Sequence, residues 1–201
     1  GCSGKHYVKY WLHNNMLNFS GTKMSKSLGN IVSAREFMDQ QNPEIYKYMI
    51  LSVHYRSISD FSEQTVELAV RALARIYSAL AVAESLLAEN ALSSAPVEIQ
   101  KDVKFEEILT SAWEGVTEAL NDDFNTPEAL ARVFEVIRIF NTQLKKGMKI
   151  SPIVLGKAKG FNDFVLKLGK VMALFEQSPS QFLNTLDNML LEKMKIQRAD
   201  V

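Results

Sequence analysis

The chain has 201 residues, 47% of them hydrophobic, and its 23 basic residues balance 23 acidic ones to a formal net charge of zero. This composition excludes a disordered or fibrous chain, and the length allows one or two globular cores. A neutral total argues against nonspecific nucleic-acid binding, and a single cysteine excludes an internal disulfide or a cysteine-rich zinc cluster.

The first third of the chain mixes short elements with turns. Residues 16–19 form a short run that suits a strand feeding the turn at Ser20-Gly21. Ser33, followed three residues later by a glutamate, has the capping-box pattern and predicts a helix to about residue 40. The Asn-Pro-Glu sequence at 42–44 supplies an N-cap and a first-turn proline, and predicts a second helix to about His54.

Three aromatic residues lie near the start of the chain. Tyr7, Tyr10 and Trp11 could stack on nucleic-acid bases, yet their spacing is that of one packed helix face. We therefore expect them to belong to the core.

Beyond about residue 60 the chain has helical periodicity, with Ser62 capping the longest predicted helix. Its apolar stripe consists of Val66, Ala69, Val70, Leu73, Ile76, Tyr77, Leu80 and Leu87. A polar linker at 90–96 precedes further helices, which we expect at Phe105–Leu120, from Thr126 to about Gly147, from Ser151, from Ser178, and from near Asp187. The repeated pattern of cap and proline predicts a helical bundle.

The segment 21–30, GTKMSKSLGN, concentrates phosphate-seeking groups in one loop, where Lys23 and Lys26 alternate with Ser25 and Ser27. Ammonium groups, hydroxyls and backbone N–H groups all bind phosphate oxygens. If the phosphates are those of ATP, two lysines beside the departing pyrophosphate would stabilise the charge that builds up in the transition state. The loop has no general base, metal ligand or Walker glycine pattern, so it supplies only part of a nucleotide site.

Residues 23–27, KMSKS, are identical to the signature pentapeptide of class I aminoacyl-tRNA synthetases, and the following LGN also resembles that family. Within the class, the flanking sequences most resemble cysteinyl-tRNA synthetases. The segments that carry this resemblance are YWLHN at 10–14, HYRS at 54–57 and DDFNTP at 122–127.

The resemblance implies a mainly α chain that begins with the C-terminal edge of a class I α/β nucleotide-binding domain. The implied divisions are a catalytic-domain portion with a short strand and the signature loop at 1–42, a helical stem-contact region at 43–92, a linker at 93–103, and a DALR-like helical tRNA-binding domain at 104–201, truncated at its C-terminus. It also implies an enzyme that activates cysteine with ATP and attaches it to tRNA. Lys26 and Lys23 would act on the ATP phosphates, and the nucleotide-binding residues would be Lys23, Met24, Ser25, Lys26 and Ser27.

Members of this family also carry a His-Ile-Gly-His-type signature and a zinc site that selects the cysteine thiolate, and neither occurs in these 201 residues. We therefore expect a C-terminal-half piece that meets cysteine through a missing N-terminal half and is inactive alone. Its histidines at 6, 13 and 54 are spaced too irregularly for a local metal site, Cys2 receives no role, and no metal ligand is predicted in the chain.

A basic stretch at 145–170 has seven lysines opposed within the stretch only by Asp163. Such a stretch is either a solvated helix face or a surface that meets a polyanion. RNA is bound mostly through phosphates and 2′-hydroxyls, for which lysines suffice. The candidate RNA contacts are Lys157, Lys159, Lys167 and Lys170.

Two other functions remain open from the sequence. One is a related ligase that joins cysteine to an amino sugar in thiol biosynthesis, which needs no tRNA surface. The other is a free-standing helical RNA-binding module. No run approaches the roughly 20 apolar residues of a membrane span, so we expect no membrane partner, and the lone cysteine favours the cytoplasm. The pair Asp122-Asp123 is expected to be structural, with its charges near a helix N-terminus.

Overall fold

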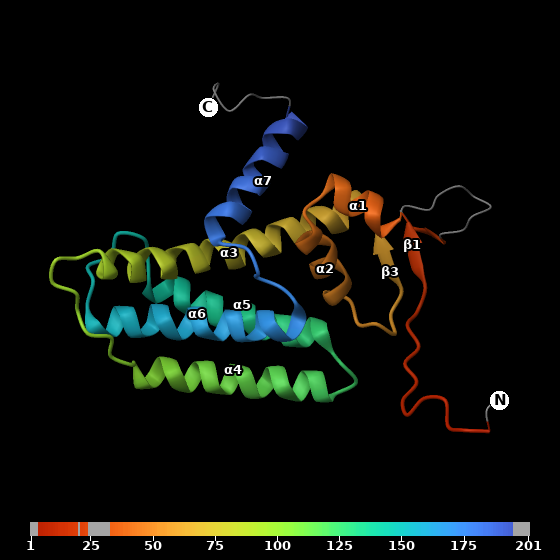
Figure 1. The fold of residues 1–201 in the computed structure, drawn as a ribbon, viewed down its shortest axis with the longest axis horizontal. Helices are drawn as coiled ribbons and strands as arrows, with labels where there is room; N and C mark the ends of the chain where they lie inside the picture. Colours follow the sequence, from red (N-terminus) through yellow and green to blue (C-terminus); the bar gives the residue numbers. More distant parts are fainter. Residues whose placement is uncertain (1–3, 20, 24–32, 195–201) are drawn as a thin grey trace.

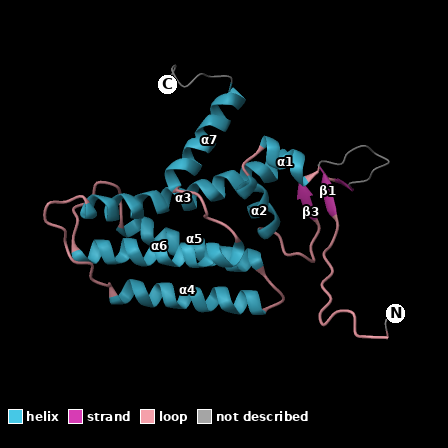
Figure 2. Cartoon of the chain, in the orientation of Figure 1, coloured by secondary structure: helices cyan, strands magenta, loops and turns pink. Residues whose placement is uncertain are grey.

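Helices dominate the computed structural model, which describes residues 4–19, 21–23 and 33–194. An elongated bundle of helices has a small sheet at one end, and the first residues extend away from that sheet (Figure 1). Coloured by secondary structure, the strands occur only at this end (Figure 2). The prediction of a mainly α chain, with a short-stranded region ahead of a helical bundle, is confirmed.

Three strands and seven helices lie within the described residues. The strands are β1 (Leu17–Phe19), β2 (Thr22–Lys23) and β3 (Ser59–Phe61). The helices are α1 (Ala34–Gln40), α2 (Pro43–Leu51), α3 (Glu63–Ala91), α4 (Val103–Asn121), α5 (Thr126–Gln143), α6 (Pro152–Met172) and α7 (Pro179–Met194). None of the helices in this part of the chain is both long and apolar enough to cross a membrane.

The sheet has the order β2-β1-β3. Its central strand β1 runs antiparallel to β2 and parallel to β3, with Leu17 opposite Ser59 and Phe19 opposite Phe61. The predicted strand at 16–19 is confirmed by β1. The sequence analysis did not predict β3, because three residues are too few to show a period of two.

Local capping determines where most helices start. Ser33 and Glu36 form the predicted capping box before α1, and Ser62 forms another with Thr65 before α3. Three further caps accept a backbone N–H and are followed by a proline in the first turn, at Asn42, Asn125 and Ser151. The helix starts at Asn42 and Ser151 were predicted with their prolines, whereas the helix predicted from Thr126 is capped by the preceding Asn125. These starts need only neighbouring residues, which is why the sequence reveals them.

Helix ends and one predicted start differ from expectation. α2 ends at Leu51 rather than near His54, and α5 ends at Gln143, ahead of the turn in which Gly147 has a φ of 73°. After α2 the chain turns back toward β1, so tertiary pairing ends this helix early. The start expected near Asp187 is wrong, because that residue lies inside α7.

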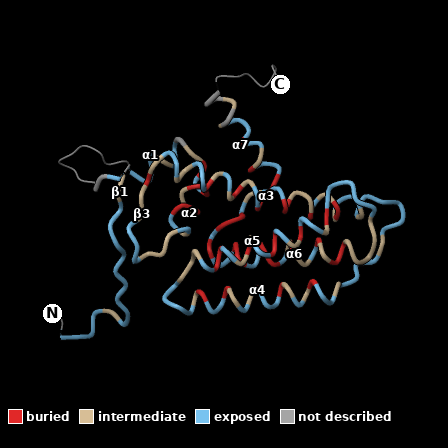
Figure 3. Tube along the Cα trace, turned by 180° about the vertical axis from the view of Figure 1, so that it is seen from behind, coloured by how far each residue is buried: buried red, intermediate tan, exposed pale blue. Residues whose placement is uncertain are grey.

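The helix α3 forms the spine of the bundle and packs against α2, α5, α6 and α7. Five of the eight apolar residues predicted for its stripe are buried, and the other three pack partly against the core. Phe140 stacks on Phe161 with ring centres 4.1 Å apart, and Tyr77 stacks on Phe182 at 4.0 Å. Buried positions recur along α3, α5 and α6 (Figure 3). Fully burying one large apolar side chain contributes about 1.5–3 kcal/mol, so this interior dominates the stability.

Candidate functional site

The signature segment continues directly from the small sheet. Lys23, its first residue, ends β2 and pairs with Asn18 of β1. The predicted nucleotide-binding residues Met24, Ser25, Lys26 and Ser27 lie outside the described residues, so their roles and the side-chain role of Lys23 remain predictions. The structure does describe how the chain is anchored on each side of them.

A turn at Gly21 leads into the signature segment. Gly21 has a φ of 76°, in the left-handed region that favours glycine. Its N–H donates a hydrogen bond of 2.8 Å to the Oδ1 atom of Asp60 in β3. The turn joins β1 to β2, so this contact also fixes it to β3, the strand on the other side of β1.

On the far side of the segment the chain enters α1 through the capping box. The N–H of Ser33 donates to Oε2 of Glu36 at 2.8 Å, and the Glu36 N–H donates to the Ser33 hydroxyl at 3.2 Å. The bond from the Ser33 backbone, followed by that from its hydroxyl, lowers the pKa of Glu36. The carboxylate is therefore charged at neutral pH, where the helix N-terminus favours it.

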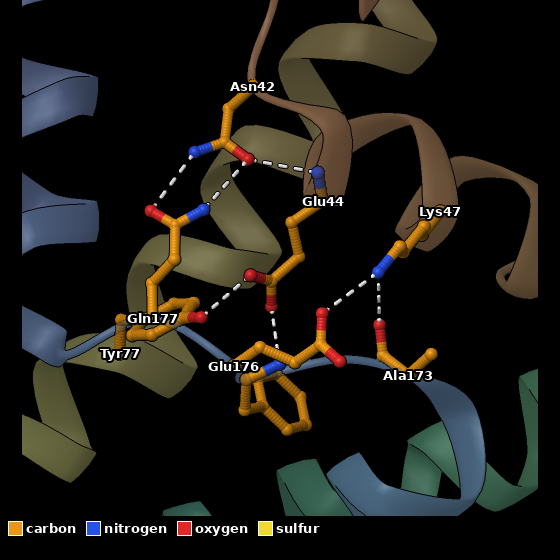
Figure 4. A network of polar contacts seen from close by, with 8 residues as sticks. Asn42, Glu44, Lys47, Tyr77, Ala173, Glu176 and Gln177 are labelled. Atoms are coloured by element: carbon orange, nitrogen blue, oxygen red, sulfur yellow. Dashed lines mark hydrogen bonds and ion pairs between the residues drawn. The ribbon is translucent and has the colours of Figure 1, made fainter.

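A buried carboxylate joins α2 to the connector between α6 and α7 (Figure 4). Glu44 is only 4% exposed, and it accepts hydrogen bonds from the Phe175 N–H at 2.6 Å and from the Tyr77 hydroxyl at 2.7 Å. Burial raises the pKa of Glu44, while the two hydrogen bonds act in the opposite direction. Burial, followed by the bond to Glu44, raises the pKa of Tyr77.

Further polar contacts flank this carboxylate. The Nζ atom of Lys47 donates to the backbone oxygen of Ala173 at 2.9 Å and lies 3.1 Å from the Glu176 carboxylate. The side-chain amides of Asn42 and Gln177 face each other at 3.4 Å (Figure 4). The pair α1–α2, which follows the signature segment, is thus fixed to the helical bundle by groups far apart in the sequence.

A second link between distant segments involves one of the paired aspartates. The carboxylate of Asp123 accepts hydrogen bonds from the Tyr55 hydroxyl at 2.6 Å and from the Arg56 guanidinium. The bond from Arg56, followed by that from Tyr55, lowers the pKa of Asp123 to about 2. The role of Asp123 is structural, as expected, but its partners are these two side chains, whereas Asn125 caps the following helix.

Two of the four lysines proposed to contact RNA are paired with acids. The Nζ atom of Lys157 lies 3.4 Å from the Asp102 carboxylate, and that of Lys159 lies 2.8 Å from the Asp163 carboxylate. Asp102 precedes α4 and therefore opposes the basic stretch from outside it. The positive charge of α6 is partly neutralised, and the RNA-binding role of these lysines remains a prediction.

The other two lysines lie toward the C-terminal end of α6. Lys167 places its Nζ atom 3.6 Å from the centre of the Trp113 ring, whereas Lys170 is exposed in the last turn. A groove of about 720 Å³ runs between α4 and α6 beside Trp113. The charged residues that line it are Lys101, Glu106, Glu114, Lys159, Asp163 and Lys167. Three basic and three acidic side chains thus balance along the groove, and Lys170 is not part of its lining.

The aromatic residues near the start of the chain are exposed, and the prediction that they belong to the core is wrong. Tyr7, Tyr10 and Trp11 are 86%, 73% and 67% exposed, and no helix occurs between residues 4 and 16. Trp11 stacks instead on His13, with ring centres 6.1 Å apart. Spacing alone suggested a helix, but a helical period has no meaning in a segment without helical backbone.

The described residues contain no group of three or more His, Cys, Asp or Glu side chains that could hold a metal ion. Two of the histidines contact rings instead, His13 that of Trp11 and His54 that of Tyr55. The family resemblance places its zinc site outside this chain, and that site stays a prediction.

Two parts of the chain match known protein families. Residues 1–71 match the family described as the class I (C) tRNA synthetase catalytic domain. Residues 115–176 match the DALR domain family. The first match contains the signature segment and the sheet, and the second extends from α4 to the connector after α6.

Curated relatives are similar along nearly the whole chain. The cysteine–tRNA ligase of Bdellovibrio bacteriovorus is 54% identical over 201 residues, which is 100% of this chain and 40% of the relative. Those of Geotalea daltonii and Pelobacter propionicus are 39% and 34% identical, over 92% and 99% of this chain and 38% and 41% of the relatives. The chain thus spans about two fifths of the length of these relatives. Along its whole length the chain is therefore similar to cysteine–tRNA ligases, and its residues 1–71 match the class I (C) tRNA synthetase catalytic domain.

Proposed function

We propose that this chain forms the signature-loop and helical part of an ATP-dependent cysteine–tRNA ligase. The observation that carries this proposal is 54% identity over all 201 residues to a relative called cysteine–tRNA ligase. The match of residues 1–71 to the class I (C) catalytic domain supports the same assignment. ATP, cysteine and tRNA are the proposed substrates, and the cytoplasm is the proposed location.

The proposed reaction has two steps. The cysteine carboxylate attacks the α-phosphorus of ATP, which forms cysteinyl adenylate and releases pyrophosphate. A hydroxyl of the terminal tRNA ribose then attacks the carbonyl carbon of the adenylate, which forms the ester and releases AMP. In the first step, Lys26 and Lys23 stabilise the charge that develops on the departing pyrophosphate, while Met24, Ser25 and Ser27 shape the loop around it. The contact between Gly21 and Asp60 supports one end of this segment.

The helical part is proposed to bind the tRNA. We retain the divisions 1–42, 43–92, 93–103 and 104–201 as catalytic portion, stem-contact region, linker and tRNA-binding domain. The match of residues 115–176 to the DALR domain supports the last of these. Lys157, Lys159, Lys167 and Lys170 remain the proposed phosphate contacts, with Lys170 the least neutralised by contacts within the described part of the chain.

A chimaeric enzyme tests this function. The chain replaces the matching segment of the Bdellovibrio bacteriovorus ligase, and cysteine-dependent ATP–pyrophosphate exchange and tRNA charging are measured. We expect both activities, and a loss of about a hundredfold or more in the exchange rate after Lys26→Ala, as for removal of one preorganised charge contact. Lys104→Ala, an exposed lysine of α4, is the matched control.

Three results would overturn the proposal. The first is full exchange activity of the Lys26→Ala chimaera. The second is cysteine transfer to an amino sugar without tRNA charging, which would favour the alternative ligase. The third is tRNA binding by the 201-residue chain combined with a chimaera that has no exchange activity, which would favour a helical RNA-binding module.

A further inference from the structure

The turn between α4 and α5 contacts the segment that follows α2, although the two are 67 residues apart at Arg56 and Asp123. The Asp123 carboxylate accepts hydrogen bonds from the Tyr55 hydroxyl at 2.6 Å, from Nη2 of Arg56 at 3.2 Å and from Nε of Arg56. The guanidinium also lies 5.2 Å from the centre of the Tyr55 ring. One carboxylate thus fixes two consecutive side chains.

The backbone of this turn is unfavourable for residues other than glycine. Asp123 and Phe124 have φ angles of 53° and 54°, both in the left-handed region. At the end of a helix that conformation usually belongs to glycine, although aspartate tolerates it better than most residues. A glycine at position 123 would relieve the backbone but remove the carboxylate. The strained aspartate is therefore explained by the contacts that its side chain makes.

The residues that Asp123 fixes are bonded to the segment that leads into β1. The backbone oxygen of Tyr55 accepts the N–H of Asn15 at 2.9 Å. The backbone oxygen of Arg56 accepts the Nδ2 group of the same asparagine at 2.7 Å. Asn15 is therefore held by the backbone of the two residues whose side chains bind Asp123.

Hydrogen bonds continue from there into the sheet. The N–H of Ser59 donates to the oxygen of Met16 at 3.1 Å, and β3 then pairs with β1. The Asp60 carboxylate accepts the Gly21 N–H, just ahead of Lys23. An unbroken series of contacts thus joins the turn of the bundle to the start of the signature segment.

The apolar side chains between the start of β1 and the helical bundle do not pack closely near Asp123. A hollow of about 500 Å³ lies between the segment before β1, the end of α2 and the start of α5. Its lining includes Leu12, Met16, Ile50 and Phe124, and the exposed fraction of these residues is between 45% and 57%. Because these side chains do not close the space, polar contacts such as those of Asp123 determine how the parts are placed here.

We propose that Asp123 is a positioning residue, which through Tyr55 and Arg56 sets the placement of β1 and the start of the signature segment relative to the helical bundle. The inference rests on the proposed function, in which this placement brings the tRNA held by the bundle to the activated amino acid. In this role Asp123 acts through Tyr55 and Arg56 and not through contact with ATP or tRNA. The Gly21–Asp60 bond still supports the signature segment from within the sheet, so the effect of Asp123 is on transfer to tRNA rather than on adenylate formation.

Hydrogen exchange in the 201-residue chain, followed by NMR, tests the structural step without any enzymatic assay. Asp123→Gly removes the carboxylate and suits the left-handed backbone, so the protein should fold. We expect exchange at the Asn15 and Ser59 amides to accelerate about tenfold, with bundle amides such as that of Val133 unchanged. Asp123→Asn should restore part of the protection, because its side-chain oxygen can still accept these bonds.

Glu67→Gln is the matched control, because Glu67 forms an exposed ion pair of 2.6 Å with Arg71 within one helix. It should leave the exchange of Asn15 and Ser59 unchanged. Unaltered exchange in Asp123→Gly would overturn the proposal. Uniform acceleration that includes the bundle amides would also overturn it, because that result indicates a general stabilising role.

The functional step is tested in the chimaera. Asp123→Gly should lower the rate of tRNA charging about tenfold and leave cysteine-dependent pyrophosphate exchange within about twofold, since the adenylate site itself is intact. An equal loss in both reactions, or no loss in charging, would overturn the positioning role. Failure of the proposed function gives a different result, namely no cysteine-dependent pyrophosphate exchange in the parent chimaera. The hydrogen-exchange measurement on the 201-residue chain does not depend on that result.

Discussion

Tyr77 donates a hydrogen bond of 2.7 Å to the buried carboxylate of Glu44, and this bond joins α3 to α2 inside the molecule. The same carboxylate accepts the Phe175 N–H at 2.6 Å. Glu44→Ala leaves both donors without their acceptor, and each buried unsatisfied group costs about 1–3 kcal/mol. We expect the free energy of unfolding, measured by urea denaturation, to fall by about 3 kcal/mol.

Tyr77→Phe is the matched variant, because it keeps the ring that stacks on Phe182 and removes only the hydroxyl. It should lower the free energy of unfolding by about 1 kcal/mol. A Glu44→Ala protein as stable as the wild type would contradict the view that this network fixes α2 to the bundle.

The pKa of Glu44 predicts a dependence of stability on pH. An unfolded glutamate titrates near 4.5, and burial raises the pKa in the folded protein above this value. Between the two pKa values the folded state binds more protons. The stability contributed by protonated Glu44 is therefore fully present below pH 4.5 and is lost as the pH rises through the folded pKa.

Glu44→Gln removes this titration and isolates its effect. We expect the wild type to lose stability relative to Glu44→Gln as the pH rises from about 4.5 toward 7. Urea denaturation of both proteins across this range measures the difference. A wild type that gains stability relative to the variant would show that the hydrogen bonds, not burial, dominate the pKa of Glu44.

The starts of the helices could be predicted from the sequence because their causes are local. A cap and its partner lie within three residues, as for Ser33 and Glu36, and a proline after a cap reinforces the signal. Helix ends depended on distant pairing, as when the chain turns after α2 so that β3 can reach β1. The aromatic residues near Trp11 misled the prediction, because three residues at suitable spacing cannot establish a helix.

The candidate site could be predicted only in part. The signature segment is contiguous, so its chemistry is visible in the sequence, and β1 and α1 on either side of it were predicted, whereas β2 was not. Glu44 was noted only as part of the Asn-Pro-Glu sequence that starts α2, whereas its partners lie 33 and 131 residues away. The partners of Asp123 are similarly distant, and no periodicity or motif indicates such contacts.

The surroundings of Gly156 in α6 and Gly115 in α4 predict different losses of stability when each is replaced by alanine. A Cβ atom at Gly156 would lie 1.9 Å from the backbone oxygen of Gln100, which cannot move independently of its chain. We expect Gly156→Ala to lower the free energy of unfolding by about 3 kcal/mol, near the upper range for overpacking. Thermal and urea denaturation measure the loss.

Gly115→Ala is the control on the facing helix α4. Its Cβ would lie 3.1 Å from the Arg132 side chain, which can shift, and alanine favours a helix by about 1 kcal/mol over glycine. The variant should therefore remain within about 1 kcal/mol of the wild type. Equal losses for the two substitutions would indicate a general intolerance of α4 and α6 rather than the contact with Gln100.

The environments of the α6 lysines predict unequal contributions to tRNA binding. Lys170 is exposed, whereas Lys157 is 20% exposed and lies 3.4 Å from the Asp102 carboxylate. A lysine that neutralises an RNA phosphate releases a counterion and contributes about 0.7–0.9 to the slope of log affinity against log salt concentration. Lys170→Gln should lower the slope by about this amount, and Lys157→Gln by less than half of it, because its charge is already compensated.

Titrations of tRNA with the 201-residue chain at several salt concentrations measure both slopes. Lys104→Gln, an exposed lysine of α4, serves as the control for loss of one charge elsewhere. If Lys157→Gln changed the slope as much as Lys170→Gln, pairing with Asp102 would not limit phosphate binding. If neither variant changed the slope, the phosphates would be bound elsewhere than at Lys157 and Lys170, because a contact that releases no counterion is not a phosphate contact.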